Sequence, residues 1–404
     1  MDPMQSMENI RIGMGKKRFY FVSCSLYLLF FMGDAFLTSY YSHYFIANGM
    51  DPMQQSVLLG VIPLSLFLGC VIMSPFAKNS RRALILFRAC ALLEASLSIG
   101  FAFCSSFWAL LPMTFLIGFF NGAPFPFIEG YVAPRAKALG IPFSTVRMFG
   151  TLGYIVSLLL GYLVLANLPV RDCYYFAGSL FFVAFFISFL LKAKSQVIVE
   201  EEPAEKPSKK GRFICKPLII FLISQLFLYG AFTAMSYLLP VRLKGLGLSD
   251  SDYSLIRGFG MVAELVTMLL IPLLGKKIRR YKIPILIASF VCLTASSCGI
   301  FVTSSYGLAY SALLLSGVGK AFLFAYQALF LQDIIGEERL AEALTINTAV
   351  TNLTAAGLNL ASSSIYTAWT FQGYFGLIVG LEVVGVVLVF LIRPKRTEAS
   401  ASEG

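Results

Sequence analysis

The sequence of 404 residues has little charge, a single histidine (His43) and no paired cysteine motif. Charged residues make up 13% of the chain, whereas a soluble protein carries roughly 25%. The eight cysteines are scattered without a C-x-x-C spacing, so neither a disulfide framework nor a metal site is predicted. We find no nucleophile–histidine pair and no phosphate-binding loop, so we expect neither an enzyme nor a cofactor.

The chain is rich in apolar residues. Hydrophobic residues make up 58% of it, mean hydropathy is +0.78, and there are 38 Phe and 19 Tyr. A bilayer core of ~30 Å is crossed by a helix of ~20 apolar residues, and such runs recur along this sequence. They predict an all-α membrane protein with twelve spans: 19–47, 54–77, 83–105, 107–130, 144–166, 171–191, 217–243, 251–275, 283–303, 307–333, 342–368 and 370–392.

The net charge is +11, and most of the basic residues fall on one side of the predicted membrane. If the N-terminus is cytoplasmic, 25 of the 32 Lys and Arg residues fall in the two tails and the loops on that side. Basic loops stay in the cytoplasm, so we expect both termini inside and a plasma (inner) membrane location. The orientation in the bilayer explains the excess of Lys and Arg over Asp and Glu, so no nucleic-acid partner is predicted.

One long hydrophilic segment divides the spans six and six. Residues 192–216 are rich in Lys, Glu, Pro and Ser and are typical of a solvated linker. We therefore expect a cytoplasmic tail (1–18), a six-helix bundle (19–191), the linker, a second bundle (217–392) and a second tail (393–404). This layout is typical of a secondary transporter with its site at mid-depth between the bundles, and we expect a monomer. Gly118-x-x-x-Gly122 and Gly376-x-x-x-Gly380 predict close helix packing.

Charges inside the predicted spans are the candidate functional residues, because each costs ~2.5–3.5 kcal/mol at mid-membrane. Asp34 shares a helical face with Tyr27, Thr38 and Tyr41, at spacings of −7, +4 and +7. This polar face is expected to line water or other helices rather than lipid. Asp34 is either a cavity residue or a buried structural acid.

A second candidate site joins the fourth and fifth spans. Glu129 ends one and Arg147 begins the next, and an antiparallel hairpin can bring them together. Thr151 and Tyr154 follow Arg147 on the same face. A forked guanidinium, a carboxylate and an aromatic ring suit a polyhydroxylated ring or an organic acid. The alternative is a plain ion pair between helices.

The second half contributes further charges. Arg257 and Glu264 lie seven residues apart, ~10.5 Å along a helix axis, so each needs a partner on another helix. Lys320 is the expected partner of Glu264 or Asp34, and such a pair could switch with one bound proton. Glu94 is a further possible member of this coupling group. Arg88 and Glu382 are interpreted as structural.

Several stretches resemble a known family. FFNGAPFPFIEG (119–130), TVRMFGTLGYIVS (145–157), MVAELVTMLLIPLL (261–274) and FQGYFGLIVGLEVVG (371–385) are similar to transmembrane helices of the major facilitator superfamily. The resemblance is to its oligosaccharide:proton symporter branch, which contains lactose-permease-like and phenylpropionate-permease-like transporters. It implies sugar-binding roles for Glu129 and Arg147, an aromatic contact from Tyr154, coupling at Glu264 and a helix 10 lysine at Lys320.

The sequence also departs from that family. Where lactose-permease-like proteins carry a His and a Glu on helix 10, this chain has Leu323 and Tyr326. Lactose and that proton relay are therefore not implied, and Asp34, Glu264 or Glu94 would have to bear a coupling proton.

The predicted function is alternating-access transport of a small polar organic solute, a sugar or nucleoside, in symport with protons. The alternatives are an aromatic carboxylate permease and a multidrug-type exporter, for which a Phe-rich cavity would suffice.

Overall fold

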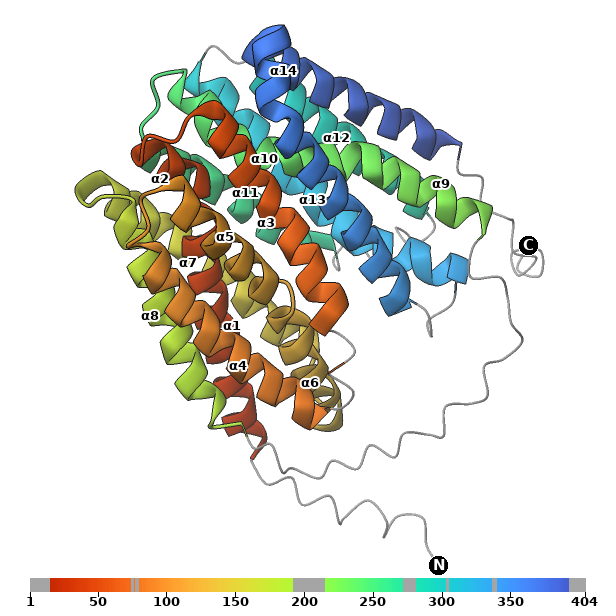
Figure 1. Cartoon of the computed structure of the whole chain (residues 1–404). Coiled ribbons are helices and arrows are strands. Elements are labelled where there is room, and N and C mark those ends of the chain that lie inside the picture. The colour runs from red at the N-terminus through yellow and green to blue at the C-terminus, as the bar shows by residue number, and fades with distance from the viewer. Residues whose placement is uncertain are drawn as a thin grey trace, which may run out of the picture. The chain divides into compact units, whose positions relative to one another are not determined.

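The computed structural model describes residues 15–73, 76, 80–191, 215–271, 281–302, 305–335 and 340–391. The predicted tail through residue 14, the linker residues 192–214 and the C-terminal residues from 392 lie outside these ranges. Within them the regular elements are all helical (Figure 1). They are α1 (Lys16–Thr38), α2 (Tyr41–Ala47), α3 (Pro52–Met73), α4 (Ser80–Phe101), α5 (Phe107–Asn121), α6 (Pro124–Ala138), α7 (Phe143–Asn167), α8 (Arg171–Ser188), α9 (Lys216–Gln225), η2 (Leu226–Gly230), α10 (Ala231–Lys244), α11 (Asp250–Leu270), α12 (Lys282–Val302), α13 (Tyr306–Ile335) and α14 (Leu340–Phe390).

These helices correspond to the predicted spans. Among the described residues, ten helical runs are long and apolar enough to cross a membrane. The other two predicted spans are α8, which starts with the charged pair Arg171–Asp172, and the first part of α14. The all-helical prediction is confirmed.

Three predicted spans are interrupted rather than continuous. The first breaks after Thr38 and resumes as α2 at Tyr41. The fourth breaks after Asn121 and continues as α6 to Ala138, beyond the predicted end at 130. The seventh contains the π-helical turn η2, a feature often found at functional sites. Breaks at mid-membrane are tolerated where the freed backbone groups face protein or water.

The extension of α6 includes Arg135, which the predicted spans 107–130 and 144–166 leave in the loop between them. This residue lies in the helix, is 7% exposed and holds its guanidinium 3.8 Å from the Tyr131 ring centroid. Its Nη1 also donates to the Tyr131 carbonyl at 3.2 Å. The cation–π contact and this hydrogen bond offset the cost of burying the charge.

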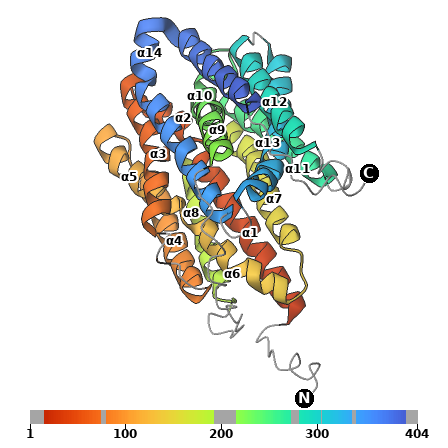
Figure 2. The same cartoon turned by 90° about the vertical axis from the view of Figure 1, so that its right-hand side faces the viewer.

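Helix α14 joins the last two predicted spans without a loop. Its 51 residues would measure ~77 Å if straight, more than twice the bilayer core. Figures 1 and 2 show that its ribbon instead folds back at one end into two arms. The last two predicted spans are thus two arms of one bent helix, with no loop between them.

Glycines allow α5 to lie directly on α3. A Cβ on Gly118 would come within 2.1 Å of Ser65 Oγ, and one on Gly122 within 2.4 Å of the Leu66 carbonyl oxygen. This confirms the close packing predicted from that spacing. The pair Gly376 and Gly380 does not mark a close helix contact of this kind, because a Cβ on Gly380 would meet no atom of the described residues within 4 Å.

Arg88 has the structural role expected of it. Its Nη2 donates to the carbonyl oxygens of Ser188 and Leu191, each at 2.8 Å. The guanidinium also lies 4.3 Å from the Phe189 ring centroid. A cation on the last carbonyls of α8 satisfies groups that the helix itself leaves without donors.

The chain forms two compact units. Unit 1 comprises Met1–Lys209 and Pro240–Met261, and unit 2 comprises Lys210–Leu239 and Val262–Gly404. In unit 1, α1 packs on α7 and α8, α3 on α5, and α4 on α5, α6 and α8. In unit 2, α12 packs on α13, and α14 packs on α9, η2 and α12. The stretch Pro240–Met261 lies within the predicted second bundle and packs with first-half helices. The six-and-six division stays a prediction.

Candidate functional site

The start of α11 is organised by a reciprocal cap. Ser249 Oγ accepts from the Asp252 backbone N–H at 3.2 Å, and Asp252 Oδ2 accepts from the Ser249 N–H at 3.0 Å. This S-x-x-D capping box fixes where the helix begins. It thereby places Asp250, Ser254 and Arg257 on one helical face, at positions i, i+4 and i+7.

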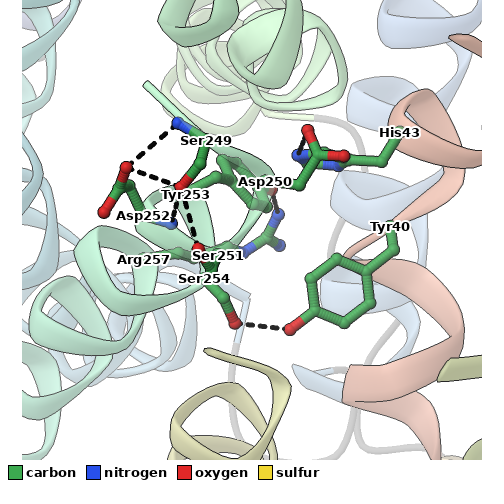
Figure 3. A network of polar contacts seen from close by, with 9 residues as sticks. All are labelled: Tyr40, His43, Ser249, Asp250, Ser251, Asp252, Tyr253, Ser254 and Arg257. Carbon is green, nitrogen blue, oxygen red and sulfur yellow. Dashed lines mark hydrogen bonds and ion pairs between the residues drawn. The ribbon is translucent and has the colours of Figure 1, made fainter. Parts of the chain in front are cut away.

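This face of α11 meets the broken first span (Figure 3). Tyr40 Oη lies 2.5 Å from Ser254 Oγ, and Ser254 donates to the Leu158 carbonyl of α7 at 2.7 Å. His43 Nε2 lies 3.6 Å from Asp250 Oδ1. The N-cap of α2, Tyr40, and the α2 residue His43 are both buried, at 0% and 3% exposure. The four side chains hold together three segments distant in sequence.

Arg257 lies one turn beyond Ser254 and bonds to two tyrosines. Its Nη1 donates to the Tyr253 hydroxyl, and its Nη2 donates to Tyr154 Oη at 3.4 Å. Tyr154 Oη also lies 3.3 Å from both Thr38 Oγ1 and Ser39 Oγ. The predicted site residue Tyr154 is therefore part of a hydroxyl cluster at the end of α1.

Glu129 and Arg147 form the predicted ion pair between α6 and α7. Arg147 Nε lies 3.4 Å from Glu129 Oε1, with the two side chains 65% and 32% exposed. Tyr27 of α1 is close enough to interact electrostatically with both charges, and its ring is buried. Thr151 follows one turn along α7 and is half-buried. A guanidinium, a carboxylate and a phenol are thus together in unit 1, with the charged groups accessible.

Asp34 lies at a second buried cluster. Its Oδ1 accepts from Asn121 Nδ2 at 2.9 Å, and Arg257 acts on it electrostatically. Glu94 of α4 faces the same carboxylate and the same amide, and its side chain is 0% exposed. Two of the predicted charged residues are therefore brought together, by an asparagine that sequence reasoning did not single out.

Unit 2 contains the other predicted pair. Glu264 of α11 is 7% exposed and interacts electrostatically with Lys320 of α13. Tyr229, which the π-helical turn η2 carries, is also close to Glu264. Lys320 Nζ lies 5.2 Å from the Phe232 ring centroid. Of the two partners considered for Lys320, the structure gives Glu264.

One residue of the predicted polar face is placed differently. Tyr41 was expected beside Asp34, but the break after Thr38 rotates it away from that face. Its ring packs with the rings of Phe101 and Tyr174, at centroid distances of 5.9 and 6.3 Å. It belongs to an aromatic core between α2, α4 and α8.

Sequence reasoning missed Tyr40, His43, Asp250 and Ser254 as well as Asn121. The S-x-x-D sequence at 249–252 was a signal for the first turn of α11, and through it for the polar face that follows. The contact of this face with α2 depends on the break in the first span, which the continuous apolar run does not reveal.

These features define a class of protein. The chain is a multi-pass membrane protein whose described residues include ten helical runs long enough to cross a membrane, with an ion pair between Arg147 and Glu129 in one unit and the buried acid Glu264 near Lys320 in the other. The profile of the Major Facilitator Superfamily matches residues 23–356 and, in a second match, residues 265–404. The chain belongs to this superfamily: it is a secondary transporter and not an enzyme.

Solved structures support the same fold. A nucleoside transporter, NupG, superposes with a TM-score of 0.72 at 16% identity, over 93% of this chain and 98% of that one. A D-xylose–proton symporter gives 0.72 at 14%, over 93% and 98%. An auto-inhibited POT family peptide transporter gives 0.74 at 12%, over 94% and 98%. Comparison with curated protein sequences gives no match. At these identities the likeness concerns the fold alone.

Proposed function

We propose that this transporter moves a small, hydroxylated organic solute, a sugar or nucleoside, in symport with protons by alternating access. Both termini lie in the cytoplasm of a cell whose plasma (inner) membrane holds the chain. The protein acts as a monomer built of two six-helix bundles, 19–191 and 217–392. The resemblance to the oligosaccharide:proton symporter branch supports this substrate class.

The observation that carries the proposal is the accessibility of the Glu129–Arg147 pair. Arg147 is exposed and Glu129 is half-buried, and an ion pair of this kind is worth only about 1 kcal/mol to stability, so folding alone gives little reason to place it within helices α6 and α7. A carboxylate accepts and a guanidinium donates, which together match the hydroxyls of a sugar or ribose. Thr151 and Tyr27 add a hydroxyl and an aromatic ring beside them. Tyr154 lies two turns from Arg147 on the same face of α7 and accepts a hydrogen bond from Arg257.

Glu264 and Lys320 supply the matching charges of the second unit. Glu264 is buried beside Lys320 and Tyr229, so its charge state depends on groups that a solute could displace. In this proposal Glu264 contacts the solute, and its pair with Lys320 re-forms in the empty carrier.

The exposed guanidinium also favours a second substrate class. Arg147 lies near Tyr27, and the Tyr27 and Phe143 rings pack edge to face at 6.2 Å. A cation beside two aromatic rings suits an aromatic carboxylate. Such a permease would need Arg147 more than Glu129.

Uptake by protein reconstituted in liposomes tests both possibilities. The solutes are uridine, D-xylose and phenylpropionate, each assayed with and without an inward proton gradient. A separate efflux assay with a cationic dye tests the multidrug-type exporter. We expect uridine or xylose to accumulate under the gradient, and E129A and R147A to abolish this accumulation. Loss in R147A alone, with phenylpropionate as the transported solute, would instead establish the carboxylate permease.

R171A is the matched control. Arg171 also forms an exposed ion pair, with Asp172 at 3.8 Å, at the start of α8 and away from the proposed site. This variant should transport as the unmodified protein does. Normal uptake of every panel solute by E129A and R147A would remove the pair from the site, and dye extrusion without any uptake would replace the carrier proposal with an exporter.

A further inference from the structure

Three helices of unit 1 bring two acids and one amide together in the interior. Asp34 comes from α1, Glu94 from α4 and Asn121 from the last position of α5. All three side chains are buried, at 8%, 0% and 6% exposure. We call them the acid–amide–acid cluster.

The Asn121 side-chain amide interacts differently with Asp34 and with Glu94. Asn121 Nδ2 donates to Asp34 Oδ1 at 2.9 Å. Glu94 faces the same amide, yet neither of its carboxylate oxygens has a hydrogen-bond partner among the described residues. A buried acceptor without a donor is rare in folded proteins and calls for an explanation.

The charges around the cluster decide which acid is ionised. Asp34 accepts a hydrogen bond from Asn121 and has the guanidinium of Arg257 near it. The ionisable groups that act on Glu94 or are acted on by it are Asp34 and Cys90, each of which is neutral or negative. An unpaired carboxylate in the interior costs several kcal/mol, and ionising the second of two adjacent carboxylates costs more still. The low-energy state therefore has Asp34 charged and Glu94 neutral.

We propose that Asp34 and Glu94 hold a single proton between them and that this cluster is where the coupling proton binds. In the described state Glu94 carries the proton and Asp34 is ionised. Proton release from Glu94 leaves two carboxylates sharing one amide, which Asn121 can bridge because its NH2 group has two donors. This inference rests on the proposed proton symport and assigns it to residues outside the solute site.

The position of Asn121 fits this role. It is the last residue of α5, directly before the break that leads into α6, and Gly122 fixes that break against α3. α6 in turn carries Glu129, seven residues from Gly122. The cluster and the solute site are therefore joined through one short helix, which gives a physical path for coupling.

The first test measures the proton directly and needs no solute. Infrared difference spectra of the lipid-reconstituted protein report the carbonyl stretch of a protonated carboxylic acid. The spectrum of unmodified protein minus E94Q should contain this band at neutral pH and lose it on alkaline titration. In D34N the neighbouring negative charge is absent, so the midpoint should move by about one pH unit toward lower pH.

Two results would overturn the proposal. A Glu94 band that persists through the whole titration would make Glu94 a permanently neutral structural acid. A midpoint unchanged in D34N would show that the two acids do not share a proton.

The second test separates this cluster from the proposed function itself. In liposomes that take up the transported panel solute, E94Q should keep exchange of labelled for unlabelled solute at equal pH and lose accumulation driven by the proton gradient. The matched control is E382Q, because Glu382 is also 0% exposed but accepts from Ser297 at 2.8 Å in unit 2. It should keep both activities.

Undiminished gradient-driven accumulation in E94Q would contradict the cluster and leave the carrier intact. Absence of exchange in the unmodified protein would contradict the proposed function instead.

Discussion

The Tyr40 hydroxyl lies 2.5 Å from Ser254 Oγ and links the broken first span to the first turns of α11. Ser254 donates its own proton to the Leu158 carbonyl at 2.7 Å, so Tyr40 is the donor to Ser254. The direction of both bonds is thereby fixed. The chain of two hydrogen bonds connects the N-cap of α2 with α11 and α7 within unit 1.

Removing the Tyr40–Ser254 hydrogen bond should destabilise the folded protein. We expect Y40F and S254A each to lower the free energy of unfolding by about 1 kcal/mol, because each leaves a buried polar partner unsatisfied. Melting of the purified protein in detergent measures both. The double variant should cost less than the two single effects added together, and strict additivity would contradict the bond.

Gly161 should not tolerate a side chain. A Cβ at this position would lie 2.0 Å from Tyr40 Oη and 2.9 Å from Ser254 Oγ. We expect G161A to lower the free energy of unfolding by about 1–3 kcal/mol through overpacking and loss of the hydrogen bond. G258A is the control, since its nearest contact would be an ordinary 3.6 Å to Leu158 Cβ. Equal melting temperatures for the two variants would exclude this packing.

The Glu264–Lys320 pair should show charge coupling. Removing either charge takes away part of the electrostatic stabilisation of the other, so E264Q and K320Q should each impair folding in the membrane. The double variant E264Q/K320Q should recover part of that loss, with a coupling of ~0.5–3 kcal/mol. Size-exclusion profiles and melting in detergent provide the measurement. A double variant no better than the worse single one would mean that the two charges act apart.

The spans could be predicted because hydrocarbon demands long apolar runs, and this demand acts on composition alone. The breaks within the first, fourth and seventh spans could not be predicted from composition. The sequence around Thr38 and Tyr41 stays apolar and aromatic through the interruption, and LFLYG at 226–230 carries no proline that would indicate a π-helical turn. These features depend on packing partners, such as Thr354, whose Cβ would lie 2.6 Å from a Cβ on Gly230.

The proximity of charged side chains was predictable from the sequence, whereas their role as a site stays a prediction. Glu129 with Arg147, and Glu264 with Lys320, follow from the rule that a buried or intramembrane charge needs a partner. Neutral members escaped the same reasoning. Asn121 at the end of α5 and Ser254 on α11 have side chains common at helix ends and on helix surfaces, and only the folded chain shows that they lie against Asp34 and Tyr40.

Solute counterflow tests the central claim most directly, because exchange through one alternating site is what separates a carrier from a receptor or a channel. Liposomes containing the protein are preloaded with the unlabelled panel solute and diluted into a trace of the labelled one at equal pH. We predict transient accumulation of label above equilibrium, present in R171A and absent in R147A. Label that only equilibrates, or accumulation that is unchanged in R147A, would contradict the carrier or its assigned site, respectively.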